Sequence, residues 1–138
     1  MKPGKDFIGV GVGAFILNDK NELLMLLRAK DSKVEPGTWM IPGGKVEFNE
    51  VMETTLQREA KEEIGVDIEV GKLICAVNHI LPEEGQHWVA PTFKCRIKEG
   101  EPKVVEHHKH DELKWFPLDK MPENLSRATK IVMENYLK

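Results

Sequence analysis

Three glutamates at helical spacing are the residues of this chain best suited to chemistry. Glu59, Glu62 and Glu63 occupy positions i, i+3 and i+4, which share one face of an α-helix. Carboxylates crowded on one face repel one another in water, but they become useful if a divalent cation sits between them and a phosphate chain. Residues 44–66 contain no cysteine or histidine, so we expect Mg²⁺, with Mn²⁺ as the alternative, rather than zinc.

Two neighbouring features fit such a metal site. Arg58 precedes Glu62 by four residues, so it can hold a carboxylate in place or neutralise part of the cluster. Gly43 and Gly44 form a Gly-Gly turn just before the expected helix. Mg²⁺ usually binds one or two carboxylates and leaves its other positions to water and substrate phosphates. It can polarise a phosphoryl oxygen, activate a water and orient a leaving group.

The carboxylates must be positioned by a helix, and its boundaries can be predicted. Asn49 is suited to cap a helix that starts at Glu50, and Gly65 is suited to end it. An apolar residue recurs every fourth position and should face the core, at Met52, Leu56, Ala60 and Ile64.

Extended segments lie on both sides of this helix. Residues 7–17 and 22–28 are predicted to form a hairpin around a polar turn at 18–21, and 39–42 is a short extended segment. Three further strands are expected at 67–81, 87–98 and 113–116, with a polar loop at 99–112 and a closing helix at 126–137. These elements predict an α/β fold in which a mixed sheet carries two helices.

Bulk properties narrow the class of protein. The 138 residues fit one domain, expected to span 1–138, and the composition is 41% hydrophobic and 31% charged. The formal net charge of −3 and the lack of a basic stripe disfavour a nucleic-acid polymer, whereas a single nucleotide remains a reasonable ligand. Cys75 and Cys95 are expected to be reduced core residues, and no segment suits a membrane span, so we expect a cytoplasmic protein.

Residues 44–66 resemble the signature of the nudix hydrolase superfamily, G-x5-E-x7-R-E-U-x-E-E-x-G-U, where U is a bulky apolar residue. The one departure is Ala60, which is small where the first U is expected. Flanking segments at 39–44, 115–118 and 121–122 are similar to those of MutT-type, nucleotide-triphosphate-diphosphatase members. The matching positions are Gly44, Glu50, Arg58, Glu59, Glu62, Glu63, Gly65 and Val66.

The resemblance implies an α/β/α sandwich and a set of roles. Glu59 and Glu63 would be the principal metal ligands, with Glu62 as a further ligand or part of the water-activating set. The carbonyl of Gly43 or Gly44 would complete the metal shell, and Arg58 would orient the carboxylates. Two positions would be structural: Glu50, which pins the loop to the helix, and Gly65. The general base is left open by the resemblance, among Glu59, Glu83, Glu84, Glu106 and Glu112.

The implied reaction is attack of water on a phosphorus atom of a nucleoside diphosphate linked to another group. The expected substrate is a nucleoside or deoxynucleoside triphosphate, cleaved to monophosphate and pyrophosphate. An ADP-ribose or nucleotide-sugar pyrophosphatase is the alternative, and a non-catalytic nudix-fold binding module is a remote one. A homodimer is expected by analogy alone.

A few residues outside the signature have both a structural and a functional interpretation. Gly9, Gly11 and Gly13 are interpreted as points of close backbone packing, because a strand rather than a helix follows them. The histidines at 107, 108 and 110 are expected to be exposed loop residues. Substrate contacts are predicted for Arg28, Trp39 and Trp88.

Overall fold

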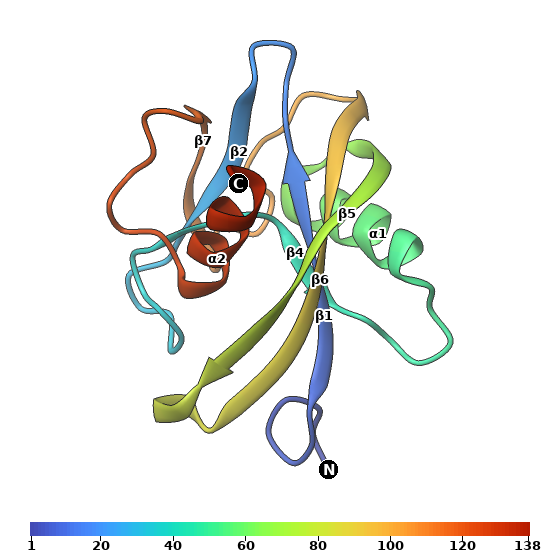
Figure 1. Ribbon diagram of the computed structural model, residues 1–138, viewed down its shortest axis with the longest axis vertical. Helices are drawn as coiled ribbons and strands as arrows, with labels where there is room; N and C mark the ends of the chain where they lie inside the picture. Colours follow the sequence, from blue (N-terminus) through green and yellow to red (C-terminus); the bar gives the residue numbers. More distant parts are fainter.

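A four-stranded mixed sheet forms the centre of the molecule (Figure 1). The computed structural model describes residues 1–138, and the strand order in this sheet is β4-β1-β6-β5. Strand β1 runs parallel to β6 and antiparallel to β4, and β5 is antiparallel to β6. The bounds of these strands are β1 Gly9–Ile16, β4 Gly43–Lys45, β5 Asp67–Leu81 and β6 Gln86–Glu99.

A second sheet of three antiparallel strands has the order β3-β2-β7. Its strands are β3 Trp39–Met40, β2 Glu22–Arg28 and β7 His110–Pro117. The prediction of a hairpin between residues 7–17 and 22–28 is therefore wrong except at the turn itself. Only Leu17 and Leu23 pair there, after which β1 and β2 diverge into different sheets. The single mixed sheet of the sequence prediction is thus divided in two.

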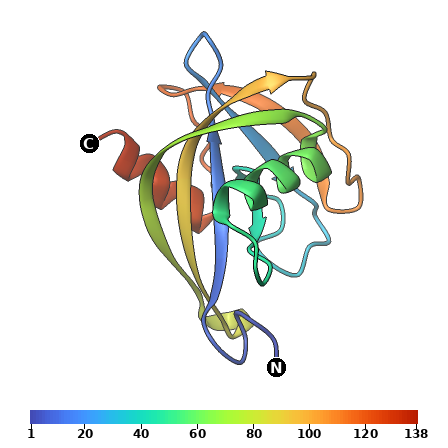
Figure 2. The same ribbon diagram turned by 90° about the vertical axis from the view of Figure 1, so that its right-hand side faces the viewer.

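The helices lie on opposite sides of the strands, as an α/β/α sandwich requires (Figure 2). Helix α1 spans Met52–Ile64 and helix α2 spans Arg127–Tyr136, while a short 3₁₀ turn, η1, spans Pro82–Glu84 between β5 and β6. Neither α-helix is long and apolar enough to cross a membrane.

Alternation along the strands explains why both faces need a helix. Successive side chains of a strand point to opposite faces, so an apolar run is stable only where both faces are covered. On β2, Leu24 and Leu26 join the core cluster beneath α1, whereas Leu23 and Met25 join the cluster beneath α2. The α1 side is completed by three residues of the predicted helical ridge, Leu56, Ala60 and Ile64, whereas its first residue, Met52, is exposed.

The start of α1 corrects one prediction. Helix α1 begins at Met52 with Val51 as its N-cap, and no side chain caps it. Asn49 instead has a φ of 70°, which is typical of a turn residue and not of an N-cap. The end of the helix is as predicted, because Gly65 has a φ of 71° and its N–H bonds the Lys61 carbonyl.

Two of the three glycines of β1, Gly9 and Gly13, are points of close packing as expected, whereas a Cβ on Gly11 would meet nothing nearer than 3.4 Å. A Cβ on Gly9 would lie 2.5 Å from the Trp88 ring, and one on Gly13 would lie 2.9 Å from the Thr92 hydroxyl. Cys75 and Cys95 are both free thiols.

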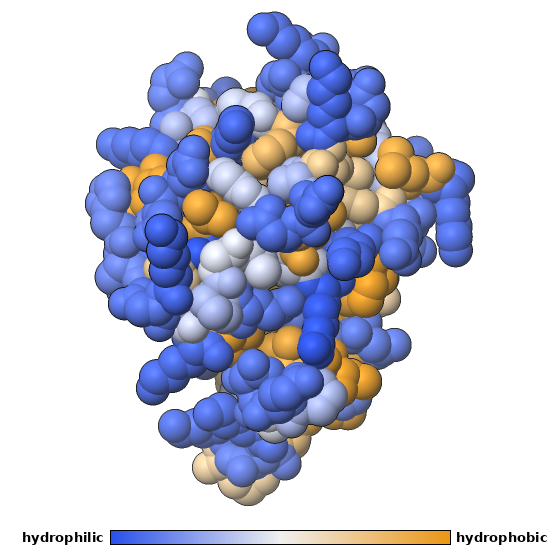
Figure 3. Space-filling view, turned by 90° about the vertical axis from the view of Figure 1, so that its left-hand side faces the viewer, coloured by the Kyte–Doolittle hydropathy of each residue, from blue (hydrophilic) through white to orange (hydrophobic).

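The face that bears β7, α2 and the segment 29–38 is largely hydrophilic, with its apolar side chains in small separate patches (Figure 3). Association into a homodimer stays a prediction.

Candidate active site

Helix α1 places the predicted carboxylates at different depths. Its inner face packs on the core through Leu56 and Ala60, so residues beside that ridge become partly buried. The side chain of Glu63 is 8% exposed, that of Glu59 is 16% exposed, and that of Glu62 is 49% exposed. Glu63 is therefore the least solvated of the three carboxylates, and its charge depends most on a partner within the protein or a bound ion.

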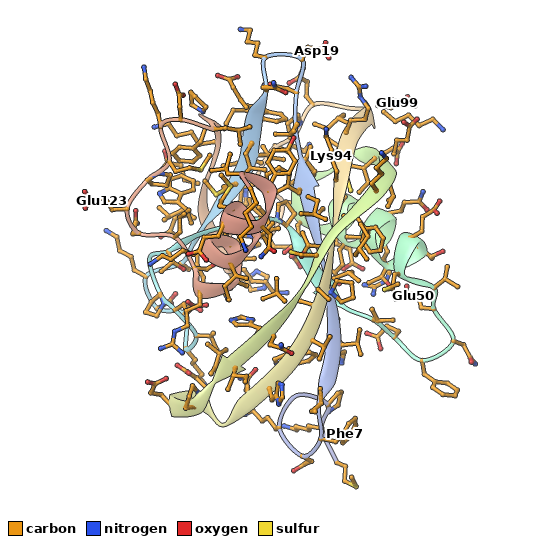
Figure 4. The ribbon with its side chains drawn as sticks, in the orientation of Figure 1. Phe7, Asp19, Glu50, Lys94, Glu99 and Glu123 are labelled. Carbon is orange, nitrogen blue, oxygen red and sulfur yellow. The ribbon has the colours of Figure 1, made fainter.

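Arg58 and Glu50 form a saturated network at the outer end of the site. The Arg58 guanidinium donates from Nε and Nη2 to the two Glu50 carboxylate oxygens at 2.8 and 2.9 Å. Glu50 also accepts from the Glu47 N–H and the Thr55 hydroxyl, which ties the loop before α1 to the helix. These hydrogen bonds, led by that from Arg58, lower the pKa of Glu50 to about 2. Glu50 lies beside α1 near the edge of the molecule (Figure 4).

The remaining donors of Arg58 reach the metal-suited carboxylates. Nη1 donates to Glu59 at 2.9 Å and to Glu62 at 3.4 Å, and Nη2 donates to the Lys45 carbonyl at 3.1 Å. These contacts suit the orienting role implied for Arg58, whose own pKa is raised chiefly by its hydrogen bond with Glu50 and then by that with Glu59. Burial raises the pKa of Glu59, while the hydrogen bond from Arg58 opposes the shift.

The Gly-Gly turn is shaped by two close approaches. A Cβ on Gly43 would lie 2.1 Å from the Val12 carbonyl oxygen, so β1 and β4 could not pair as they do. A Cβ on Gly44 would lie 2.2 Å from the carboxyl carbon of Glu59. Glycine at 44 therefore leaves room for that carboxylate directly against the backbone.

Glu63 lies on the inner side of the same turn. Its Oε1 accepts from the Gly43 N–H at 2.9 Å, and its Oε2 lies 3.7 Å from Nε2 of His110. Burial raises the pKa of Glu63 to about 8, although the Gly43 hydrogen bond opposes the shift. A buried carboxyl of this kind is suited to a cation, which would compensate its charge.

His110 is the main residue that sequence reasoning missed. It was expected to be exposed in a loop, but it begins β7 and is 4% exposed. Burial lowers the pKa of His110 to about 4, so the imidazole is neutral near pH 7. Ligand atoms of Glu63, Glu106 and His110 all lie within 4.8 Å of one another. The one feature of the sequence that could have indicated a strand here is the return of apolar residues shortly after His110, at Leu113.

Among the candidates for the general base, only Glu59 and Glu106 remain close to Glu63. Glu59 lies one helical turn away, and Glu106 belongs to the cluster just described. Glu83 and Glu84 belong to η1, where Glu83 lies 3.5 Å from Arg127. Glu112 is exposed on β7.

A cavity of about 690 Å³ extends from this site toward the far end of β5 and β6. The site end is lined by the Gly43–Lys45 strand, Glu63 and His110, and the other end by His79, Trp88 and α2. Its volume is within the range of small-molecule sites. Glu59 and Glu62 are not part of its lining.

The predicted substrate contacts have different locations. Arg28 and Trp88 line the cavity. Trp39 is a correction: the residue is 8% exposed, and its ring packs edge-on against Phe116 in the core beneath α2. The short strand that carries Trp39 turns this side chain inward, while its neighbours Met40 and Ile41 line the cavity.

Four buried polar atoms have no hydrogen-bond partner in the protein, and all belong to residues in or beside this cavity. His110 Nδ1 lies toward the carboxylate end, and Arg28 Nε lies between the two ends, with the guanidinium near both Glu35 and Glu63. His79 Nε2 and Glu35 Oε1 lie toward the other end, 3.6 Å apart. Leaving such an atom unpaired costs about 1–3 kcal/mol, so their gathering around one cavity indicates a ligand site.

The carboxylates around the Gly-Gly turn offer oxygen ligands that suit a divalent cation. The buried Glu63 carboxylate, the cradle at Gly44 that admits Glu59, and the cluster with Glu106 supply oxygen ligands from three directions. Oxygen ligands suit Mg²⁺ and Mn²⁺. The residues therefore fit the cation that the sequence predicted.

Comparisons with known proteins give a consistent result. A model of the NUDIX domain family matches residues 8–136. The crystal structure of a MutT NUDIX hydrolase from Burkholderia pseudomallei superposes with a TM-score of 0.87 at 41% identity, covering 94% of this chain and 98% of that one.

Curated relatives carry more specific names. The mouse protein "8-oxo-dGDP phosphatase NUDT18" is 32% identical over 111 residues, which are 79% of this chain but 32% of the relative. The Proteus vulgaris "8-oxo-dGTP diphosphatase" is 35% identical over 72 residues, which are 52% of this chain and 64% of the relative. This chain thus spans about a third of the mouse relative.

Proposed function

Because this chain belongs to the NUDIX family, we propose that it is a hydrolase of phosphoric anhydride bonds that cleaves nucleoside triphosphates to monophosphate and pyrophosphate, with a divalent cation as cofactor. Oxidised guanine nucleotides are the first substrates to consider, since the names of two relatives specify them.

The charge of the cavity is the observation that carries the proposal. The chain as a whole has a formal net charge of −3. The cavity lining nevertheless contains only two carboxylates, Asp31 and Glu63, against four basic side chains: Arg28, Lys33, Lys45 and Lys109. A cavity that is basic within an acidic protein, with a cation site at one end, suits a polyphosphate.

The opposite end of the cavity suits a nucleobase. Trp88 presents an aromatic ring that is fixed by packing against Gly4 and Gly9, and its Nε1 donates to Gln86. His79 adds a buried ring nitrogen without a partner. Aromatic faces stack on bases, and unpaired polar atoms select base edges. A nucleotide placed along the cavity would join the two ends.

The chain's own residues would divide the work as follows. Glu59 and Glu63 would hold the cation, with Glu62 at the exposed edge and Arg58 orienting Glu59. A bound divalent cation polarises a phosphoryl oxygen and orients the leaving group. Arg28 and Lys45 would neutralise phosphate oxygens. The general base is drawn from Glu59 and Glu106, the two candidates close to Glu63.

Product analysis by anion-exchange chromatography tests this function. The protein is incubated with Mg²⁺ or Mn²⁺ and a panel of canonical and oxidised nucleoside triphosphates and diphosphates, ADP-ribose and nucleotide sugars. Glu63→Gln is the variant expected to be inactive, and Glu123→Gln, the same change at an exposed residue, is the matched control.

Monophosphate and pyrophosphate from a triphosphate, lost only in Glu63→Gln, is the expected result. If the protein instead releases monophosphate and inorganic phosphate from a nucleoside diphosphate, the diphosphate is the substrate and not the triphosphate. Cleavage of ADP-ribose or a nucleotide sugar alone would favour the alternative pyrophosphatase. No turnover by the folded protein would favour a binding module.

A further inference from the structure

We propose that His110 is a metal ligand, and that its imidazole makes the cation site prefer a transition metal such as Mn²⁺ to Mg²⁺. The inference rests on the proposed function only in that the same cation would serve hydrolysis. No residue of the nudix signature supplies a nitrogen ligand, because residues 44–66 contain no histidine.

The geometry places three ligand types around one point. Nε2 of His110 lies 3.7 Å from Oε2 of Glu63, and the ligand atoms of both residues and Glu106 fall within 4.8 Å of one another. Ligands bound at about 2.0–2.2 Å are at most about 4.4 Å apart across one ion. The 3.7 Å pair already fits, and small side-chain movements would bring in Glu106.

The backbone builds this arrangement from one turn and one irregular strand pair. The N–H groups of Lys109 and His110 both donate to the Glu106 carbonyl, at 2.9 and 3.1 Å, so Glu106 and His110 are brought together across a single tight turn. The register between β2 and β7 shifts at Leu27 and Arg28, where Arg28 pairs with His110. Such an irregularity re-aims side chains, and here His110 lines the cavity.

Burial gives a second, independent indication. His110 is 4% exposed and neither of its ring nitrogens makes a hydrogen bond: Nδ1 is buried without a partner, and Nε2, the nitrogen that would bind the cation, faces Glu63 Oε2 at 3.7 Å. A histidine at the core edge normally pairs its polar atoms, because an unpaired one is costly. His110 instead turns toward a carboxylate with which it makes no hydrogen bond, since 3.7 Å exceeds hydrogen-bond range.

The donor set predicts the preference. Mg²⁺ favours oxygen ligands and retains several waters, whereas imidazole nitrogen binds transition metals more strongly. One imidazole with two carboxylates leaves open positions for water and phosphate, as a hydrolytic site needs. Mn²⁺ accepts both kinds of donor, so of the two ions expected at this site it is the one that gains more from His110.

Electron paramagnetic resonance of bound Mn²⁺ tests the proposal without any substrate. Pulsed measurements detect the nuclear coupling of a directly bound imidazole nitrogen, and ¹⁵N-labelling of histidine changes that coupling. The protein, His110→Gln and the control His108→Gln are compared, since His108 also lines the cavity but is exposed. Affinities for Mn²⁺ and Mg²⁺ are measured on the same samples.

A nitrogen coupling in the parent protein and in His108→Gln, absent from His110→Gln, is the expected result. Mn²⁺ affinity should fall on the order of tenfold in His110→Gln, with Mg²⁺ affinity changing less than about threefold. No nitrogen coupling in the parent protein, or a coupling that persists in His110→Gln, would overturn the proposal.

If His110→Gln does not fold, a protein lacking the other four histidines decides the matter. A retained nitrogen coupling supports His110 as the ligand, and a lost coupling contradicts it. Because the readout is metal binding alone, failure here leaves nucleotide hydrolysis standing, and failure of hydrolysis leaves the ligand assignment standing.

Discussion

The polar groups on the two sides of the Gly43–Lys45 strand differ in how completely they are hydrogen-bonded. On the outer side, Glu50 accepts four hydrogen bonds, from Glu47, Thr55 and two donors of Arg58. On the inner side, Arg28 and His110 line the cavity with a buried ring or guanidinium nitrogen left unpaired. A saturated network needs no ligand and holds the loop in place, whereas an unsaturated set lowers its free energy by binding one.

The matched substitutions Glu63→Gln and Glu50→Gln test this difference most directly, because each removes one carboxylate from one side of the strand. Glu63→Gln should lower kcat at least about a hundredfold, since metal stabilisation of the transition state is worth several kcal/mol. Its unfolding midpoint without metal should not fall, because the buried ionisable group is removed. Glu50→Gln should lower the midpoint by releasing the loop. Thermal unfolding and steady-state kinetics measure both, and near-normal turnover by Glu63→Gln would remove Glu63 from the metal site.

Alanine substitutions at Gly43 and Gly44 should distinguish the structural side of the strand from the catalytic side, with smaller effects on kcat than Glu63→Gln. In Gly44→Ala the new Cβ meets the Glu59 carboxylate, so kcat should fall about tenfold or more with a modest change in stability. In Gly43→Ala the Cβ meets the Val12 carbonyl, so the pairing of β1 and β4 and hence stability should suffer first. Gly11→Ala, whose nearest contact is 3.4 Å, is the control. Equal stability losses at 43 and 44 would contradict this distinction.

His79→Leu sharpens the comparison at the far end of the cavity. The unpaired Nε2 of His79 should contact the base and not the reacting phosphate. KM should therefore rise about tenfold with kcat within about twofold, the pattern of lost uniform binding. Stability should fall modestly, because Glu35 Oε1, which lies 3.6 Å from Nε2, loses the imidazole that faces it. A fall in kcat with unchanged KM would place His79 in the chemistry instead.

The smallest effect is a pH dependence of stability in the metal-free protein. The pKa of Glu63 is about 8 when folded against 4.5 for an unperturbed Glu, so the native state holds the extra proton and stability falls as pH rises between these values. His110, at about 4 against 6.5, acts in the opposite direction below pH 6.5.

Between pH 6.5 and 8 only the Glu63 contribution of this pair remains. Stability in the presence of a chelator should fall there by at most about 1.4 kcal/mol per pH unit, and Glu63→Gln should flatten the profile. Denaturant unfolding at several pH values measures the slope. An identical slope in the parent protein and the variant would assign it to other groups.

The parts of the molecule that sequence could predict are those fixed by local spacing. The carboxylates of α1 share a face because helical periodicity requires it, Gly65 ends the helix through its left-handed backbone, and the strand segments follow from apolar runs. The Arg58 contacts with Glu59 and Glu62 also lie within one helix.

The parts that sequence could not predict depend on tertiary structure. Chain continuity suggested a hairpin, but β1 and β2 find better partners in β6 and β7. His110 is buried only because β7 pairs with β2 across an irregular register. Trp39 is turned into the core by a strand of two residues, too short for its face to be inferred. Glu35 is brought to His79 by a turn in which its own φ is 41°.

A crystal structure with Mn²⁺ and a non-hydrolysable analogue of the preferred triphosphate tests the central claim most directly. The anomalous signal of Mn²⁺ should lie within bonding distance of Glu63, with the triphosphate beside Lys45 and Arg28 and the base near Trp88. Mn²⁺ bound away from Glu63, or a base seated at the carboxylate end of the cavity, would contradict the account.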